Sequence, residues 1–154
     1  MRSPIIAAIV SAALAISTSG MAQQAGFGTA QEARAMLDKA VAAVKSDRAG
    51  ALAMFNKGEN GFRDRDLYPF CFNLSDGKFV AAIKDLLEKD VRTLKDSAGK
   101  VFGPELYAAA HKPEGQMTEV SYMFPRPGGD KTPAPKVTFV TRVGELGCGV
   151  GYYQ

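Results

Sequence analysis

The sequence has a single histidine, two cysteines and no residue cluster typical of a metal or catalytic site. One imidazole, at His111, cannot form a zinc site without the cysteines, and the D-x-D of Asp64 and Asp66 lacks the Gly and Glu of a calcium loop. No Ser lies in a strand-turn-helix elbow, and a lone His at the end of a predicted helix more often caps that helix. We therefore expect no metal and no cofactor, and an enzyme is the least favoured function.

Clusters of lysine and arginine are absent as well, although the formal net charge is +3. Binding to nucleic acid depends on clustered cations that neutralise phosphates, so nucleic acid is not an expected partner. A membrane surface is equally unsupported. After residue 22, no stretch has the roughly 20 apolar residues that a membrane-spanning helix needs.

Residues 1–22 are typical of a cleaved export signal, with Arg2 before an apolar core at residues 5–16 and a small-residue pattern ending in Ala22. The apolar core is too short for a stable span, although a retained anchor is the alternative. Cleavage leaves residues 23–154, which is the usual size of one domain. It removes Arg2 and no acidic residue, so the formal net charge falls from +3 to +2. We expect a soluble periplasmic or secreted protein.

A capping box and an apolar stripe predict a helix at residues 30–45. Thr29 and Glu32 form the T-x-x-E pattern, in which a hydroxyl and a carboxylate satisfy the first unpaired amides of a helix. The stripe has spacings of three and four and consists of Ala33, Met36, Leu37, Ala40, Val41 and Val44. The pattern weakens and then resumes at residues 52–55 before Gly58 ends it. This predicts either one long kinked helix or two helices in series.

The stretch at residues 67–80 predicts two strands joined by a tight turn at residues 75–77. In the first strand Tyr68 and Phe70 alternate with Cys71, so the aromatic rings and the thiol face opposite ways. Only one face of the sheet is expected to pack on the long helix. The aromatic face therefore lines either a pocket or the protein core.

Most of the remaining chain predicts antiparallel sheet. The expected strands, which alternate or are rich in β-branched residues, are residues 116–124, 136–143 and 148–153. Residues 125–135 contain four prolines and two glycines, which predict a loop. The other expected elements are helical turns at residues 83–90, a short extended piece at 90–94 and a short helix at 101–111. Because helices and strands are segregated along the chain, the predicted fold class is α+β.

The two cysteines, Cys71 and Cys148, lie in predicted strands of an exported protein. An oxidising compartment favours a disulfide, which would stabilise the fold by about 4 kcal/mol because it closes a long loop. Two buried free thiols are the alternative. A redox role is weaker still, since the sequence has no C-x-x-C.

Three glycines alternate in the last predicted strand, at Gly147, Gly149 and Gly151. They resemble a dinucleotide-binding fingerprint, but no helix follows them to bind the phosphates. We expect instead that the last strand approaches a neighbouring element closely.

Five segments carry a family pattern: LYPFCFNLSDGKFV, KDVRTLKDSAGK, VSYMFPRPG, PKVTFVTRV and the terminal GCGVGYY. Together they resemble the single Cache domain of bacterial extracytoplasmic sensors, over essentially all of residues 23–154. The resemblance implies a PAS-like antiparallel sheet of about five strands, with a long N-terminal helix on one face. It also implies a pocket on the other face for a small organic ligand, often a carboxylate.

Cache domains of this type usually lie between two membrane helices of chemoreceptors or histidine kinases. By resemblance, this chain is a free-standing periplasmic version that acts in signal transduction or chemotaxis through a separate membrane receptor or kinase. The chain departs from the family pattern at Ala82, Ile83 and Glu88, where the family has a His-Pro loop and a Gly. A ligand mode that uses that histidine does not transfer. The alternative is a non-catalytic interaction module with a degenerate pocket.

The residues expected to bind the ligand are Tyr68, Phe70, Tyr122, Lys136 and Arg63. Lys136 would hold a carboxylate by a charge-assisted hydrogen bond beside the two phenols, a role that the resemblance supports. In this role, Lys136→Ala would abolish a ligand-induced thermal shift and would change the stability of the ligand-free protein by no more than about 0.5 kcal/mol. The alternative is a solvated lysine near the start of a strand. Arg63 would reach an anion from the loop mouth, unless it pairs with a neighbouring aspartate. This interpretation requires an open hollow lined by the phenols and the lysine.

Overall fold

The structure, a computed structural model, describes residues 26–128 and 131–154, so the predicted export signal at residues 1–22 lies outside the described residues. The helices are α1 (Ala30–Ser46), α2 (Arg48–Lys57) and α3 (Gly103–Ala110), with two short 3-10 turns, η1 (Lys84–Leu86) and η2 (Val91–Thr93). The strands are β1 (Pro69–Asn73), β2 (Phe79–Ala81), β3 (Thr118–Pro125), β4 (Pro133–Val143) and β5 (Leu146–Tyr153). They form one antiparallel sheet in the order β2-β1-β5-β4-β3.

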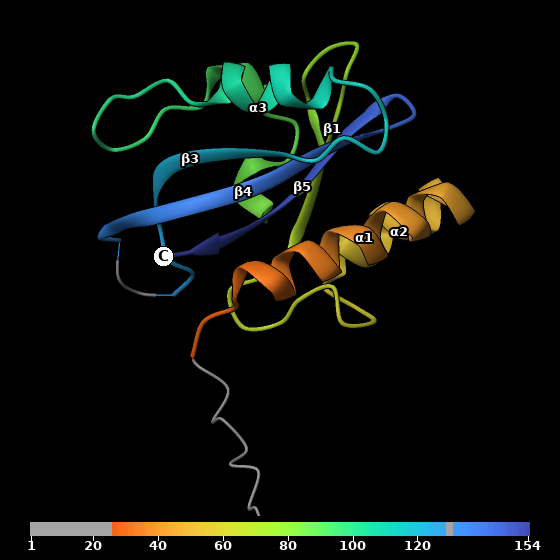
Figure 1. The fold of residues 1–154 in the computed structure, drawn as a ribbon, viewed down its shortest axis with the longest axis horizontal. Coiled ribbons are helices and arrows are strands. Elements are labelled where there is room, and N and C mark those ends of the chain that lie inside the picture. The colour runs from red at the N-terminus through yellow and green to blue at the C-terminus, as the bar shows by residue number, and fades with distance from the viewer. Residues whose placement is uncertain (1–25, 129–130) are drawn as a thin grey trace, which may run out of the picture.

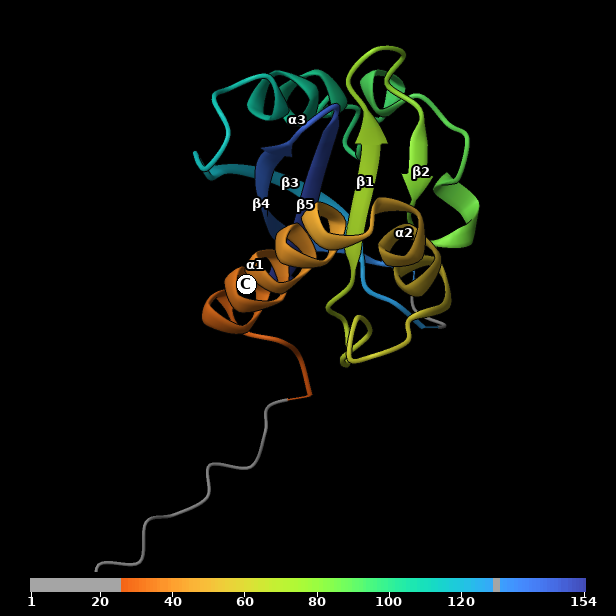
Figure 2. The same cartoon turned by 90° about the vertical axis from the view of Figure 1, so that its right-hand side faces the viewer.

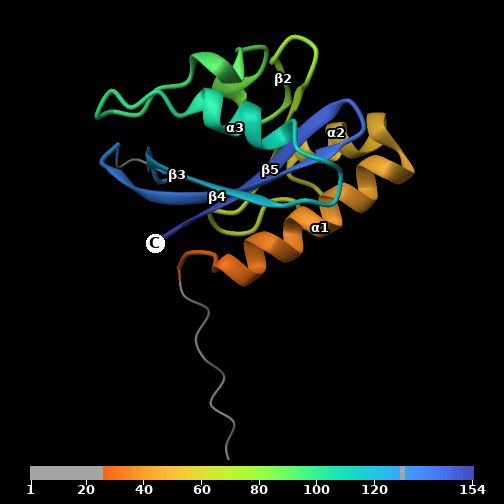
Figure 3. The same cartoon turned by 45° about the horizontal axis from the view of Figure 1, so that its top comes forward.

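Helices cover both faces of this sheet, and the predicted α+β class is confirmed. Helices α1 and α2 pack on one face, and α3 lies on the other (Figure 1). Figure 2 shows α1 crossing the middle of the sheet while α2 lies near β1 and β2. On the opposite face, α3 and the segments around it lie over the strands (Figure 3). No helix within the described ranges is long and apolar enough to cross a bilayer.

The ends of the two N-terminal helices are set by hydrogen bonds between residues close in the sequence. The Thr29 hydroxyl accepts from the Glu32 amide at 3.2 Å, and the Glu32 carboxylate accepts from the Thr29 amide at 2.8 Å, which is the predicted capping box. Asp47 follows the last residue of α1, and its side chain accepts from the Gly50 amide at 3.1 Å, which caps α2. Two helices in series is therefore the correct alternative. Gly58 ends α2 with φ 70°.

Strand β1 separates its aromatic and thiol side chains as predicted. Phe70 and Phe72 lie in the core beneath α3, whereas Cys71 lies in the core beneath α1. Cys71 pairs with Cys148 of β5, and the two form a disulfide, which confirms the predicted bond. Both cysteines are fully buried, so the bond joins adjacent strands inside a helix-covered core.

The proline-rich stretch predicted as a loop at residues 125–135 is shorter than expected. Strand β3 extends to Pro125, and β4 begins at its partner Pro133. Proline is tolerated where a strand has a neighbour on one side only, because no ladder partner then needs its missing N–H. β3 is the edge strand, and β4 pairs with β5 only from Lys136 onward. The prolines therefore extend the hairpin instead of interrupting it.

The short extended piece predicted at residues 90–94 is wrong, since this segment contains the 3-10 turn η2. The Asp90 carboxylate accepts from the Arg92 amide at 2.9 Å and caps this turn. The same carboxylate forms an ion pair with the Arg92 guanidinium at 2.6 Å, which lowers the pKa of Asp90. Local hydrogen bonds to a side chain thus favour a turn where the apolar pattern favours a strand.

Candidate functional site

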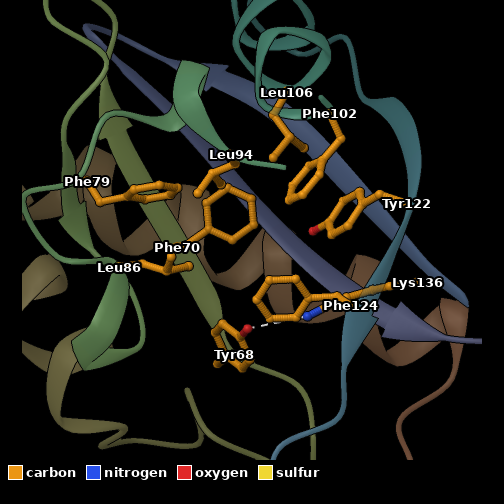
Figure 4. Close-up of a pocket in the computed structure, with 10 residues that line it drawn as sticks. All are labelled: Tyr68, Phe70, Phe79, Leu86, Leu94, Phe102, Leu106, Tyr122, Phe124 and Lys136. Carbon is orange, nitrogen blue, oxygen red and sulfur yellow. Dashed lines mark hydrogen bonds between the residues drawn. The ribbon is translucent and has the colours of Figure 1, made fainter. Parts of the chain in front are cut away.

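The face of the sheet beneath α3 contains a small hollow, which we call the inner hollow. Ten side chains line it: Tyr68, Phe70, Phe79, Leu86, Leu94, Phe102, Leu106, Tyr122, Phe124 and Lys136 (Figure 4). Its free volume is about 20 Å³, which is room for about one water molecule. The open hollow expected from the sequence is therefore nearly closed, because the protein's own rings occupy most of it.

The rings can pack this closely because β5 presents glycines to them. A Cβ atom at Gly147 would lie 2.6 Å from the Phe72 ring, and one at Gly149 would lie 2.6 Å from the Phe70 ring. Real Cβ atoms essentially never come so close to a neighbour. The alternating glycines therefore leave a shallow channel along β5 for the aromatic side chains of β1, and the predicted close approach is confirmed.

The third glycine of β5 determines where Lys136 can reach. Lys136 lies on β4 and pairs with Tyr153 of β5. A Cβ atom at Gly151 would lie 2.4 Å from the Cε atom of Lys136, so the lysine stem crosses β5 directly over this glycine. The ammonium then reaches Tyr68, which precedes β1 on the far side of β5. Because of this glycine, a residue of β4 can place its charge beside the β1 side of the sheet.

The ammonium of Lys136 lies inside an aromatic cage, which we define as Tyr68, Phe124 and Tyr153. Its Nζ atom is 4.8 Å from the Tyr68 ring centre, 5.2 Å from that of Phe124 and 4.8 Å from that of Tyr153. Nζ also donates to the Tyr68 hydroxyl at 3.3 Å (Figure 4). Lys136 is only 4% exposed, so the alternative of a solvated lysine is wrong, and the small stability change expected for Lys136→Ala loses its premise of a surface residue.

This buried cation has no acidic partner. Within residues 26–128 and 131–154, no carboxylate forms an ion pair with Lys136. Ring faces attract a cation by about 0.5–2 kcal/mol each, whereas removing an ammonium from water costs several kilocalories per mole even after relaxation. The buried carboxylate of Asp66 is close enough to the cage to help raise the pKa of Tyr153, but it forms no ion pair with Lys136. The rings thus offset part of the cost of holding an ammonium in this apolar setting. Such a setting attracts an anion more strongly than water would, because the local dielectric constant is low.

The phenols around the cage are held by internal hydrogen bonds. The Tyr122 hydroxyl lies 2.8 Å from the Thr138 hydroxyl, and its ring stacks on Phe102 with centres 3.9 Å apart. The Tyr153 hydroxyl donates to the Pro125 carbonyl at 2.7 Å. Burial raises the pKa of Tyr122 and of Tyr153 above the ordinary value for a phenol. Both phenols therefore remain neutral, and neither neutralises the lysine.

Four of the five residues predicted from the sequence come together in this site. Tyr68, Phe70, Tyr122 and Lys136 all line the inner hollow. Arg63 does not, because it is exposed and its side chain lies against Gly58 at the end of α2. Arg63 is therefore not part of the site, and the binding roles of the other four residues stay predictions.

Sequence reasoning missed two of the three cage residues. Phe124 shares the alternation that places Tyr122 on the inner face, so the signal for it was present. Tyr153 is the partner of Lys136 across the ladder, which depends on the strand register. Register is set by long-range pairing and could not be read from the last strand alone.

A larger hollow lies next to the first, and we call it the outer hollow. Its free volume is about 220 Å³. It shares three side chains with the inner hollow: Tyr68, Leu86 and Phe124. The other residues that line it are Ile83, Asp85, Pro125, Arg126, Pro127, Gly128 and Lys131. The lysine cage thus lies next to a space large enough for an organic molecule.

One known family model matches most of this chain. The dCache_2 family model, described as a Cache domain, matches residues 59–154. This match covers the whole sheet and α3. No curated protein matches the chain.

Several solved structures share the fold at low sequence identity. A methyl-accepting chemotaxis protein from Vibrio parahaemolyticus has a TM-score of 0.61 and 21% identity, over 80% of this chain and 86% of that chain. A periplasmic sensor domain of a chemotaxis protein has a TM-score of 0.59 and 22% identity, over 80% and 88%. A Cache chemosensory domain described for its recognition of carboxylic acid has a TM-score of 0.57 and 22% identity, over 80% and 86%. At this identity the likeness shows the fold alone.

Proposed function

Because this chain belongs to the Cache domain family, whose sensor domains are non-catalytic, we propose that it is an extracytoplasmic sensor that binds a small carboxylate at Lys136. The domain would be a single, free-standing Cache domain, exported by residues 1–22 and retained in the periplasm or secreted. It would report the ligand to a separate membrane receptor or kinase. The disulfide and the likeness to periplasmic sensor domains support an extracytoplasmic location.

The buried ammonium of Lys136, which forms no ion pair with any of the described residues, is the observation that carries this proposal. A carboxylate beside Nζ would form a charge-assisted hydrogen bond and would neutralise the buried charge. The Tyr68 hydroxyl, which now accepts from Nζ at 3.3 Å, is close enough to donate to the second carboxylate oxygen. The structural neighbour described for carboxylic acid recognition supports the same ligand class.

The nearly closed inner hollow suggests how occupancy would become a signal. The side chains that separate the two hollows, Tyr68, Leu86 and Phe124, are only half-buried, whereas Phe79 and Phe102 behind them are fully buried. A ligand would therefore displace the half-buried side chains of Tyr68, Leu86 and Phe124 and leave Phe79 and Phe102 in place. Binding would select a conformation in which the loops around the outer hollow have moved, and a partner would recognise that surface.

An interaction module with a degenerate pocket is the second candidate function. The small volume of the inner hollow favours it, as do Ala82 and Ile83 in place of the family's His-Pro loop. Glu88, however, stands where the family has a Gly and takes φ 64°, so the backbone there keeps a conformation that glycine favours.

Thermal unfolding of residues 23–154 with small carboxylates distinguishes the two functions. A ligand at 100 times its dissociation constant stabilises the folded state by about 2.7 kcal/mol, which raises the melting temperature by several degrees. Each acid is paired with its neutral amide, which has the same shape and no charge. We expect acids to raise the melting temperature, amides to have no effect, and K136M to abolish the response. An unchanged thermal shift in K136M would show that another residue anchors the carboxylate. If no acid raised the melting temperature, the interaction module would be favoured.

A further inference from the structure

The volumes of the two hollows restrict how a carboxylate could be placed. The inner hollow has room for about one water molecule, so it accommodates one carboxylate oxygen and no carbon skeleton behind it. The outer hollow has about 220 Å³, and an apolar cavity of about 150 Å³ is enough to bind benzene. The body of a ligand anchored at Lys136 would therefore lie in the outer hollow.

The lining of the outer hollow is mainly apolar. Its apolar side chains are Ile83, Leu86, Phe124, Pro125 and Pro127, and Tyr68 adds a ring. Asp85 and Lys131, which carry opposite charges, are both exposed at its rim. A hollow of this composition binds a hydrocarbon or aromatic body better than a second charged group.

Arg126 also lines the outer hollow, but it is only half-buried, so its charge is partly hydrated. Its guanidinium carbon lies 4.4 Å from the Phe27 ring centre and 5.3 Å from the Tyr153 ring centre. Its Nη2 atom donates to the Gln154 carbonyl at 3.4 Å. Its Nε atom is buried and has no hydrogen-bond partner in the part of the chain that the structure describes, so Arg126 is a second cation that an acid could meet. Lys136 is the better anchor, because it is only 4% exposed and a carboxylate would replace less of its hydration.

Lys136 lines the inner hollow, and two rings of its cage separate it from the outer hollow. Its Nζ atom faces Tyr68 and Phe124, and both of these rings belong to the lining of each hollow. A carboxylate entering from the outer hollow would meet the ammonium as soon as these half-buried rings turned aside. Its apolar body would then remain against the prolines and Ile83.

We propose that the ligand is a monocarboxylic acid with a compact apolar body of about one ring, its carboxylate at Lys136 and its body in the outer hollow. This inference rests on the proposed function and names the ligand class for the same site. Very short acids leave the outer hollow unfilled and bind weakly. A second carboxylate would lose hydration in a mainly apolar lining, where the exposed Lys131 and the half-buried Arg126 compensate only in part, and would weaken binding.

Calorimetric titration of residues 23–154 with acetate, benzoate, phenylacetate and terephthalate tests this inference, with phenylacetamide as the uncharged control. One methylene in an apolar pocket changes binding by about tenfold or more. We therefore expect phenylacetate or benzoate to bind at least about tenfold more tightly than acetate and terephthalate. Tighter binding of acetate or terephthalate would overturn the inference and leave the proposed function intact. Binding of no acid at all would overturn both.

A substitution in the lining of the outer hollow tests where the body of the ligand lies. Ile83→Ala removes apolar contact from the outer hollow and leaves the lysine cage untouched. It should weaken phenylacetate by about fivefold or more and leave acetate unchanged. Val101→Ala is the matched control, since Val101 is 45% exposed and lines neither hollow. Equal losses for phenylacetate and acetate in Ile83→Ala, or no loss at all, would overturn the placement.

Discussion

Replacing Lys136 by methionine separates the cost of its charge from the packing of its stem. Methionine is unbranched and nearly as long, so it keeps most of the apolar contacts over Gly151 and inside the cage. Alanine does not, because it also removes the buried stem. That loss alone is about 2 kcal/mol or more, so K136A cannot isolate the charge.

The expected effect of K136M follows from the contacts of the ammonium. The three cage rings lie 4.8, 5.2 and 4.8 Å away and contribute about 0.5–2 kcal/mol each. The hydrogen bond to Tyr68, at 3.3 Å, is longer than usual and adds less than the roughly 1.5 kcal/mol of a good charged one. Desolvation costs several kilocalories per mole with no ion pair to offset it. Replacing a buried ion pair by apolar residues of similar volume is often stabilising by about 1–4 kcal/mol, and the ring contacts of Lys136 offset part of such a gain. We therefore expect K136M to raise the free energy of unfolding by about 1 kcal/mol, the low end of that range.

Urea unfolding of residues 23–154 with the disulfide intact measures this difference. K57M is the matched control, because the Lys57 side chain is 66% exposed and the substitution should change stability by no more than about 0.5 kcal/mol. The melting temperature of K136M should rise by about 3 °C. A loss of more than about 1 kcal/mol in K136M relative to K57M would refute the reasoning, because the cage would then stabilise the charge by itself.

Three further predictions concern the strands and the N-terminal helix. Gly151→Ala should displace the Lys136 side chain, because the new Cβ atom would overlap the lysine stem. Urea unfolding should show a free energy of unfolding lower by about 1–2 kcal/mol, and acids should no longer raise the melting temperature. A full thermal shift with acids would show that the lysine does not need to cross β5. Replacing Cys71 and Cys148 by alanine should lower the melting temperature and cost about 4 kcal/mol, and a thiol titration of the unfolded, unreduced protein should detect no free thiol. Hydrogen bonds from Arg65 and from the Thr29 amide lower the pKa of Glu32 from 4.5 to about 2. The contribution of the Glu32 carboxylate to stability is therefore present above pH 4.5 and disappears as the pH falls toward 2. Glu32→Gln should therefore flatten the decrease in urea midpoint over this range, and an unchanged slope would show that Glu32 does not contribute.

The parts of the fold that sequence reasoning predicted correctly are set by contacts between near neighbours. The capping box at Thr29 and Glu32 spans one helical turn, and the alternation around Cys71 depends on strand geometry alone. The errors arise where a side chain or a distant strand decides the local conformation. Asp90 caps a turn that the apolar pattern does not show, and the prolines of β4 are tolerated because β5 does not extend that far.

The candidate site shows the same division between local and long-range information. The sequence placed Lys136 and Tyr122 on one face correctly, since they lie in alternating strands. It could not indicate that Gly151 allows the lysine to cross β5, because this depends on how two strands pair. Arg63 was misplaced for a related reason. Arg65, two residues later, instead turns toward α1 and pairs with Glu32 at 2.7 Å.

The stability of K136M also decides between the two candidate functions. A protein that only presents its surface to a partner gains nothing from a buried ammonium without a carboxylate, and methionine would serve its core at least as well. A ligand-binding protein needs that charge, because the acid supplies the missing partner. A variant that is more stable and no longer responds to acids would therefore show that Lys136 lowers stability in exchange for binding. A variant that is less stable would show that the ammonium holds the cage together, which is the behaviour expected of a structural residue in an interaction module.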